Sequence, residues 1–145
     1  MKKVSCEGLL DTQKLAQDLA KQIKKGDVIC LDGDLGAGKT AFTGFLLKAL
    51  GVQEESIPSP TFSIVNEYQT KLFTIYHFDA YRLANSEEIF DNGFDEYIYS
   101  DAISVIEWAS IVMDALPKNR WEIIITKDLE KGEEYRDFSI SKEGK

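Results

Sequence analysis

The sequence predicts an α/β fold: a single domain over residues 1–145, in which helices flank one mixed sheet of parallel and antiparallel strands. The length suits one domain with a single sizeable core. Two short runs, Val28 to Leu31 and Ala102 to Ile106, are almost entirely apolar, which is typical of central strands that helices cover on both faces. The first run leads into a glycine-rich loop and then a helix-periodic segment, so strand, loop and helix form one unit.

Periodicity predicts the remaining elements around these two strands. Apolar residues recur at helical spacing in residues 12–23, where Asp11 or Thr12 is the expected cap, and again in residues 42–50. The other expected elements are an edge strand at residues 3–7, an antiparallel hairpin of residues 62–68 and 72–78, short helical pieces between residues 80 and 101, and two more strands at residues 121–126 and 135–140 joined by a polar turn at residues 128–132.

The glycine-rich loop, Gly33 to Thr40, matches the pattern G-x-x-x-x-G-K-[ST] at every required position. Its glycines let the backbone aim N–H groups at a phosphate, Lys39 reaches the β- and γ-phosphates, and Thr40 offers a hydroxyl ligand to Mg²⁺. The chain is therefore predicted to be a P-loop NTPase domain that binds ATP and Mg²⁺, since no guanine-reading Asn-Lys-x-Asp motif occurs. The predicted nucleotide-binding residues are Asp34, Leu35, Gly36, Ala37, Gly38, Lys39, Thr40 and Ala41.

Acidic residues at strand ends decide which reaction such a loop supports. Glu107 follows the second apolar run, the usual position of an acid that holds Mg²⁺ through water or activates the attacking water. Asp79 ends another apolar strand, and Thr61 follows a stiffened Ser-Pro segment that could fold over the γ-phosphate as a switch loop. We predict Asp79, Glu107 and Thr61 as catalytic and Thr40 with Glu107 as metal ligands. A salt-bridged Glu107, a capping Asp79 and an ordinary strand-start Thr61 are the open alternatives.

Two aromatic or titratable residues lie beside these acids without a settled role. His77 is the single histidine, and at the end of an apolar strand a hydrogen-bonded packing residue is more common than a catalytic one. Trp108 adjoins Glu107 and is either a core residue or a shield against bulk water. The aromatic residues between positions 90 and 99 indicate core, with a partner surface as the alternative.

Composition narrows the classes of partner and compartment. The chain has 17 basic and 25 acidic residues and a net charge of −8, which disfavours direct nucleic-acid binding by a basic face. Cys6 and Cys30 lack metal-ligand spacing and are expected to be reduced core residues. No targeting segment or membrane-spanning run is visible, so the expected protein is cytoplasmic and does not enter a membrane.

Four motifs together, at residues 33–40, 59–62, 77–83 and 106–108, resemble in order and spacing those of the TsaE (YjeE) family. They read Gly-Asp-Leu-Gly-Ala-Gly-Lys-Thr, Ser-Pro-Thr-Phe, His-Phe-Asp-Ala-Tyr-Arg-Leu and Ile-Glu-Trp. The resemblance covers nearly the whole chain. It implies a bacterial ATPase required for N6-threonylcarbamoyl modification of adenosine in tRNA, which works with the TsaD and TsaB proteins and meets tRNA through that complex.

The same resemblance implies roles for individual residues. Lys39 and Thr40 would hold phosphate and Mg²⁺, Thr61 would belong to a switch-like loop, and Asp79 and Glu107 would be metal-linked or catalytic. Family members often carry a second hydroxyl residue where this chain has Ala41, so a hydroxyl that could bond the α-phosphate is missing and the strength of nucleotide binding stays open.

Two other functions remain open on the sequence alone. A small-molecule P-loop kinase needs an acceptor pocket and usually an arginine-bearing lid, but Arg82, Arg120 and Arg136 are scattered singly. A non-hydrolysing module would use ATP only to control a protein interface. The scarcity of arginine near the predicted acids leads us to expect an ATPase that is slow alone and depends on a partner for its rate.

Overall fold

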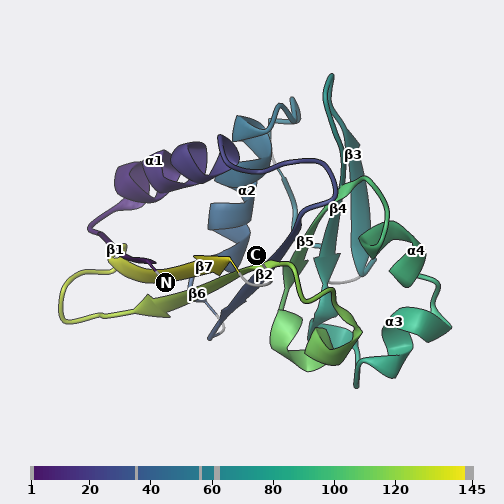
Figure 1. Cartoon of the computed structure of the whole chain (residues 1–145). Helices are drawn as coiled ribbons and strands as arrows, with labels where there is room; N and C mark the ends of the chain where they lie inside the picture. Colours follow the sequence, from purple (N-terminus) through teal and green to yellow (C-terminus); the bar gives the residue numbers. More distant parts are fainter. Residues whose placement is uncertain (1, 35, 56, 61–62, 143–145) are drawn as a thin grey trace.

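A mixed sheet of seven strands forms the centre of the molecule (Figure 1). The structure is a computed structural model that describes residues 2–34, 36–55, 57–60 and 63–142. The strands are β1 (Lys2–Cys6), β2 (Val28–Gly33), β3 (Val65–Gln69), β4 (Thr74–Asp79), β5 (Ile103–Glu107), β6 (Trp121–Lys127) and β7 (Arg136–Lys142). They are hydrogen-bonded in the order β1-β7-β6-β2-β5-β4-β3. The mixed sheet of an α/β protein is therefore confirmed.

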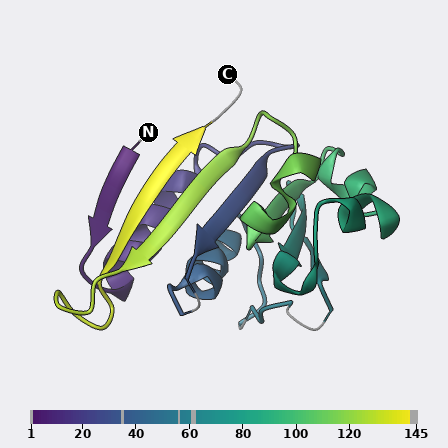
Figure 2. The ribbon, with the colours of Figure 1, turned by 90° about the horizontal axis from the view of Figure 1, so that it is seen from below.

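The middle of the sheet is parallel and its two sides are antiparallel. β2 runs parallel to both β5 and β6, and β4 runs parallel to β5. The pairs β1–β7, β6–β7 and β3–β4 are antiparallel, and Figure 2 shows β1, β7, β6 and β2 lying side by side. The predicted antiparallel hairpin is confirmed as β3 and β4, and the two strands predicted near residues 121–140 are confirmed as the antiparallel pair β6 and β7. The first hairpin arm was predicted to begin at residue 62, which lies outside the described residues. The described strand begins at Val65, directly after Ile64, whose left-handed φ of 70° does not suit a strand.

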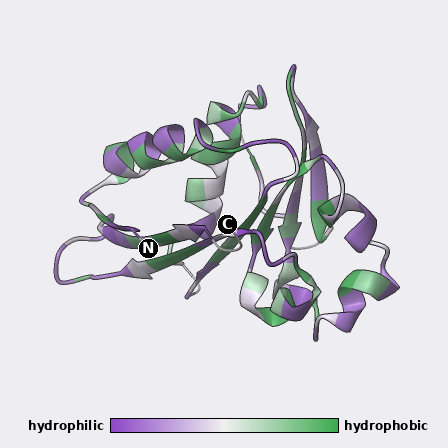
Figure 3. Cartoon of the chain, in the orientation of Figure 1, coloured by the Kyte–Doolittle hydropathy of each residue, from purple (hydrophilic) through white to green (hydrophobic). Residues whose placement is uncertain are grey.

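Helices cover both faces of this sheet (Figure 1). α1 (Leu9–Ala20) and α2 (Lys39–Ala49) lie on one face, and η1 (Ala80–Arg82), α3 (Glu87–Asp91), α4 (Asp95–Ile98) and η2 (Ala109–Ala115) lie on the other. Hydrophobic residues concentrate in the central strands, while the helices carry polar residues on their outer sides (Figure 3). No helix within the described ranges is both long and apolar enough to cross a membrane.

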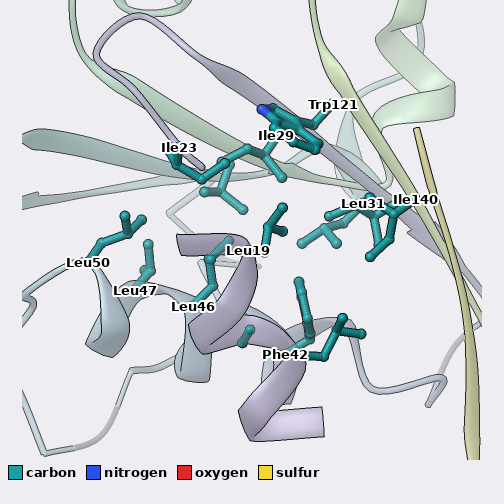
Figure 4. Close-up of a cluster of buried hydrophobic side chains, with 14 of the residues drawn as sticks. Leu19, Ile23, Ile29, Leu31, Phe42, Leu46, Leu47, Leu50, Trp121 and Ile140 are labelled. Carbon is teal, nitrogen blue, oxygen red and sulfur yellow. The ribbon is translucent and has the colours of Figure 1, made fainter. Parts of the chain in front are cut away.

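Strand β2 separates two hydrophobic cores because its side chains alternate between the two faces of the sheet. Ile29 and Leu31 pack with α1 and α2, where Figure 4 shows them beside Leu19 and Leu46. Val28 and Cys30 pack with α3, α4 and η2 on the opposite face. All four residues at the start of β2 are fully buried, and burial raises the pKa of the Cys30 thiol to about 12. Both cysteines are free and buried, as expected.

Helix starts differ from the sequence expectation by a few residues. α1 begins at Leu9 with Gly8 as its N-cap, so neither Asp11 nor Thr12 caps it. The Asp11 carboxylate instead accepts a hydrogen bond from the backbone N–H of Glu7 at 3.0 Å, which satisfies the chain just before the helix from within its first turn. Asp95, an N-cap candidate by its residue type, lies inside α4, and Phe94 is the N-cap. The whole of η2 was not predicted, because its short turns carry no helical period of 3.6 residues.

Candidate nucleotide-binding site

Three parallel strands end side by side at the candidate site. β2 ends at Gly33, β4 at Asp79 and β5 at Glu107, and Asp79 pairs directly with Glu107 in the register of β4 and β5. Carboxyl ends of parallel strands meet at one edge of a sheet, where α/β proteins bind their ligands. The cleft at this edge has a volume of about 330 Å³. Its described lining is Gly36, Gly38, Lys39, Thr40, Ala41, Ser59, Asp79, Tyr81, Glu107 and Trp108.

The phosphate loop, residues 33–40, turns from β2 into the N-terminus of α2. Gly38 is the N-cap of α2 with a φ of 101°. Gly33 has a φ of 152°, and a Cβ atom at this position would lie only 2.4 Å from the carbonyl oxygen of Ile125 on β6. Both glycines are therefore required by the backbone itself. Leu35, a predicted binding residue, lies outside the described residues.

Lys39, the first residue of α2, contacts the backbone of the loop with its side chain. Its Nζ donates to the carbonyl oxygens of Gly33 at 2.5 Å and Asp34 at 2.9 Å. The same Nζ lies 4.0 Å from the centroid of the Trp108 ring, a cation–π contact. Burial lowers the pKa of Lys39, and the nearby carboxylate of Glu107 acts in the opposite direction. The ammonium group is thus positioned at the loop by neutral partners, which phosphate oxygens are able to replace.

Trp108 lines the cleft and has an unusual backbone conformation. It has a left-handed backbone with φ 60° and ψ 38°, an arrangement that is uncommon for a bulky residue and concentrates at functional sites. Its ring lines the cleft, and the centroids of the Tyr81 and Trp108 rings are 4.9 Å apart. Trp108 therefore borders the cleft and also packs against the hydrophobic core on the η2 side of the sheet, and the shielding role stays a prediction.

Thr40 and Glu107, the two predicted metal ligands, meet at the base of the cleft. The Thr40 hydroxyl donates to Oε1 of Glu107 at 3.1 Å. Oε2 of Glu107 lies 2.5 Å from Nε2 of His77, and Glu107 is only 2% exposed. A pairing between β4 and β5, together with the first turn of α2, brings these three side chains together. The alternative considered for Glu107, a structural pairing of the strand-end carboxylate, takes the form of this contact with the His77 ring.

Asp79 has a local structural task as well as a place in the cleft. Its Oδ1 accepts the backbone N–H of Tyr81 at 3.0 Å and so caps η1, while Oδ2 accepts the Ser59 hydroxyl at 3.2 Å. The capping alternative is therefore realised. The bond from Ser59 also ties the proline-containing segment to the end of β4, next to Glu107. Thr61, predicted in the same segment, lies outside the described residues.

Comparison with known proteins identifies the family. The family model of TsaE, the threonylcarbamoyl adenosine biosynthesis protein, matches residues 6–136. The chain belongs to the TsaE family. The tRNA threonylcarbamoyladenosine biosynthesis protein TsaE of Bacillus subtilis is 37% identical over 134 residues, which are 92% of this chain and 81% of that protein. The protein of the same description from Rickettsia felis is 44% identical over 106 residues, 73% of this chain and 61% of that protein.

A solved structure supports the same assignment. The crystal structure of Bacillus subtilis YdiB superposes with a TM-score of 0.80 at 31% sequence identity, covering 99% of this chain and 86% of that chain. The resemblance to the TsaE family that four sequence motifs indicated is thus confirmed, together with the α/β fold.

One positively charged residue at the phosphate loop of this TsaE chain was not predicted. Arg136, at the start of β7, donates from Nε to the carbonyl oxygen of Ala37 at 2.7 Å. Its Nη1 donates to the carbonyl oxygens of Glu133 and Tyr135, each at 2.7 Å. The Arg136 side chain therefore stabilises the backbone of the loop at Ala37, although the two residues are far apart in the sequence. In the sequence, Arg136 was marked only as a single arginine near the beginning of a predicted strand. Arg82, the arginine nearest to Asp79 in the sequence, is exposed on η1.

The oxygen donors at the base of the cleft fit Mg²⁺ bound with a nucleotide. Mg²⁺ prefers oxygen ligands, keeps several waters, and is usually held by one or two carboxylates plus the substrate's phosphates. Thr40 and Glu107 supply one hydroxyl and one carboxylate, and their oxygens already lie 3.1 Å apart. Among the described residues no three His, Cys, Asp or Glu side chains gather into a metal cage. This small donor set suits a cation that arrives with a nucleotide.

Proposed function

We propose that this TsaE-family chain is a Mg²⁺-dependent ATPase that acts in N6-threonylcarbamoyladenosine formation in tRNA, in the cytoplasm and together with TsaD and TsaB. The observation that carries the ATPase part is the Thr40–Glu107 hydrogen bond of 3.1 Å directly beneath the phosphate loop. Membership of the TsaE family and the names of the relatives support the tRNA part. The acidic net charge of −8 favours contact with tRNA through partner proteins.

The residues of the cleft divide the work of ATP hydrolysis among them. Loop N–H groups of residues 36–41 and the N-terminus of α2 bind phosphate oxygens, and Lys39 exchanges its carbonyl partners for them. Thr40 and Glu107 would hold Mg²⁺, which supplies charge neutralisation at the β- and γ-phosphates. Asp79, whose carboxylate accepts the backbone N–H of Tyr81, would orient the attacking water. Trp108 limits access of bulk water to this cleft.

The charges of the cleft favour hydrolysis that depends on a partner. Lys39 is the one positively charged side chain in the described lining. Arg136 is occupied by backbone carbonyls, and Lys127 approaches the loop at Gly36 without lining the cleft. Transition-state charge on the γ-phosphoryl group is therefore incompletely neutralised in the isolated chain. The same shortage argues against a small-molecule kinase, which uses arginines to carry the transferred group.

Reconstitution tests this function. ATPase rates are measured for the chain alone, with TsaD and TsaB, and with both proteins plus tRNA. We expect a slow rate alone that rises on adding the partners, as in GTPases, where a group supplied in trans raises the rate about 10³- to 10⁵-fold. A fast rate that the partners leave unchanged contradicts the proposal. Phosphoryl transfer to a small metabolite indicates a kinase instead, and Mg-ATP binding without hydrolysis in any mixture indicates the interaction module.

A further inference from the structure

A fully buried histidine lies behind the proposed metal site. His77 on β4 has no exposed surface, and its Nε2 lies 2.5 Å from Oε2 of Glu107. Nδ1 of the same ring has no hydrogen-bond partner within the part of the chain that the structure describes. Neither the phosphate loop nor the water-orienting role of Asp79 uses this side chain. Within the described residues, the one polar contact of the ring is therefore the contact between Nε2 and the Glu107 carboxylate.

The chemistry of the pair sets the direction of the hydrogen bond. An ionised carboxylate only accepts, so Nε2 must carry the proton and donate it to Glu107. Leaving Nδ1 as the bare nitrogen avoids a buried N–H without an acceptor, which would be destabilising. The two oxygens of Glu107 then have different partners. Oε2 accepts from His77, and Oε1 accepts from Thr40.

The sheet makes this arrangement rigid. In the register of β4 and β5, His77 pairs with Val105, two residues before Glu107, so both side chains emerge on the same face of the sheet. The terminal torsion of a glutamate is broad and does not fix the plane of the carboxylate by itself. A donor held on the neighbouring strand does fix it, because it anchors one oxygen and thereby aims the other at Thr40.

We propose that His77 is a positioning residue for Glu107: its Nε2–H orients the carboxylate so that Oε1 faces Thr40 and the cation bound with ATP. The inference rests on the proposed function of the site and adds a residue to it. Donors behind metal-binding groups orient them, and their loss costs about 10- to 100-fold in metal affinity or activity. A side chain of the same volume that lacks the N–H donor would not orient the Glu107 carboxylate.

A pair of amide variants separates positioning from packing. His77→Gln places an amide N–H near the position of Nε2, whereas His77→Asn places the same group one bond shorter, where it does not reach Glu107. His77→Leu keeps bulk and removes the donor. We expect His77→Gln to stay within about threefold of the unchanged chain, and the other two to lose about 10- to 100-fold in kcat and in the affinity for Mg²⁺. ATP affinity without Mg²⁺, measured by calorimetry in EDTA, should be the same for all of them.

A second arm shows whether His77 acts through Glu107. In a Glu107→Gln background, adding His77→Asn should lower kcat and Mg²⁺-dependent binding no further, whereas a purely structural defect would add to the loss. Circular dichroism and thermal melting check that each variant folds, and if His77→Leu does not fold the amide pair decides. Equal values for the Gln and Asn variants overturn the inference. If the unchanged chain itself shows neither Mg²⁺-dependent ATP binding nor hydrolysis, the proposed function fails instead.

Discussion

At the scale of single residues, the proposed function makes Lys39 the side chain that contacts the phosphates of ATP. Its Nζ bonds carbonyl oxygens at the cleft, so Lys39→Ala should remove a charge-assisted contact to ATP and leave the fold intact. We expect affinity for Mg-ATP to fall about 10- to 100-fold, since hydrogen bonds to charged groups contribute about 1.5–3 kcal/mol. Calorimetric titration measures it. Lys48→Ala, in the last turn of the same helix, is the matched control, and undiminished binding by folded Lys39→Ala refutes the loop's role.

Variants of Glu107 and Asp79 test ATP hydrolysis separately from ATP binding. Glu107→Ala and Asp79→Ala should keep ATP affinity within about tenfold and lose turnover about 100-fold or more, with Glu107 the more severe, because metal and water placement matter most in the transition state. Asp79→Ala also removes the cap of η1, which costs about 0.5–2 kcal/mol of stability. Asp79→Asn keeps an acceptor for the Tyr81 N–H, so it separates the two effects. Normal turnover in the Asn variant would leave Asp79 with its capping role alone.

At the scale of elements, the junction of β2 with the phosphate loop depends on close approach to β6. A methyl group at Gly33 would lie 2.4 Å from the Ile125 carbonyl oxygen, so Gly33→Ala must displace the loop from its neighbouring strand. We expect loss of Mg-ATP binding and a decrease of about 1–3 kcal/mol in the free energy of unfolding, the range for strained backbone.

Gly44 in the middle of α2 is the matched control for this prediction. A Cβ atom there meets nothing within 4 Å, so Gly44→Ala should raise stability by about 0.5–1 kcal/mol and leave ATP binding unchanged. Urea unfolding and calorimetry measure both variants. Equal behaviour of the two alanine variants would contradict the packing argument at Gly33.

At the scale of the whole molecule, nucleotide binding should appear as added stability. The site joins the ends of β2, β4 and β5 with the start of α2, so it exists only in the folded chain. A ligand that binds only the folded state adds about 2.7 kcal/mol at 100 times its Kd. For a domain of this size that is a rise of about 5–10 °C in Tm. Thermal melting with Mg-ATP checks this, and an equal rise for Lys39→Ala would point to binding elsewhere.

How far the fold could be predicted depended on whether its signals are local. The buried strand at Val28 to Leu31, the turn from it into α2, the β3–β4 hairpin and the two C-terminal strands were predicted correctly, because alternation, apolar runs and glycine spacing are properties of short stretches. The start of α1 was placed too late, since Gly8 caps it without a side-chain signal. η2 was not predicted, because short 3₁₀ turns do not repeat apolar residues with the 3.6-residue period of an α-helix.

By itself, the sequence determined the family, through the order of the TsaE motifs, and supplied the groups on which the proposed chemistry depends: a glycine-rich loop with Lys39 and two strand-end acids. Only the tertiary structure decided which of these groups meet. His77 lies 30 residues from Glu107, and Arg136 lies 99 residues from Ala37, and no local pattern links either pair. Strand order and register bring them together, and those are set by packing two cores on opposite faces of one sheet. Local chemistry is therefore readable from short motifs, whereas contacts between strands follow from the energetics of the whole chain.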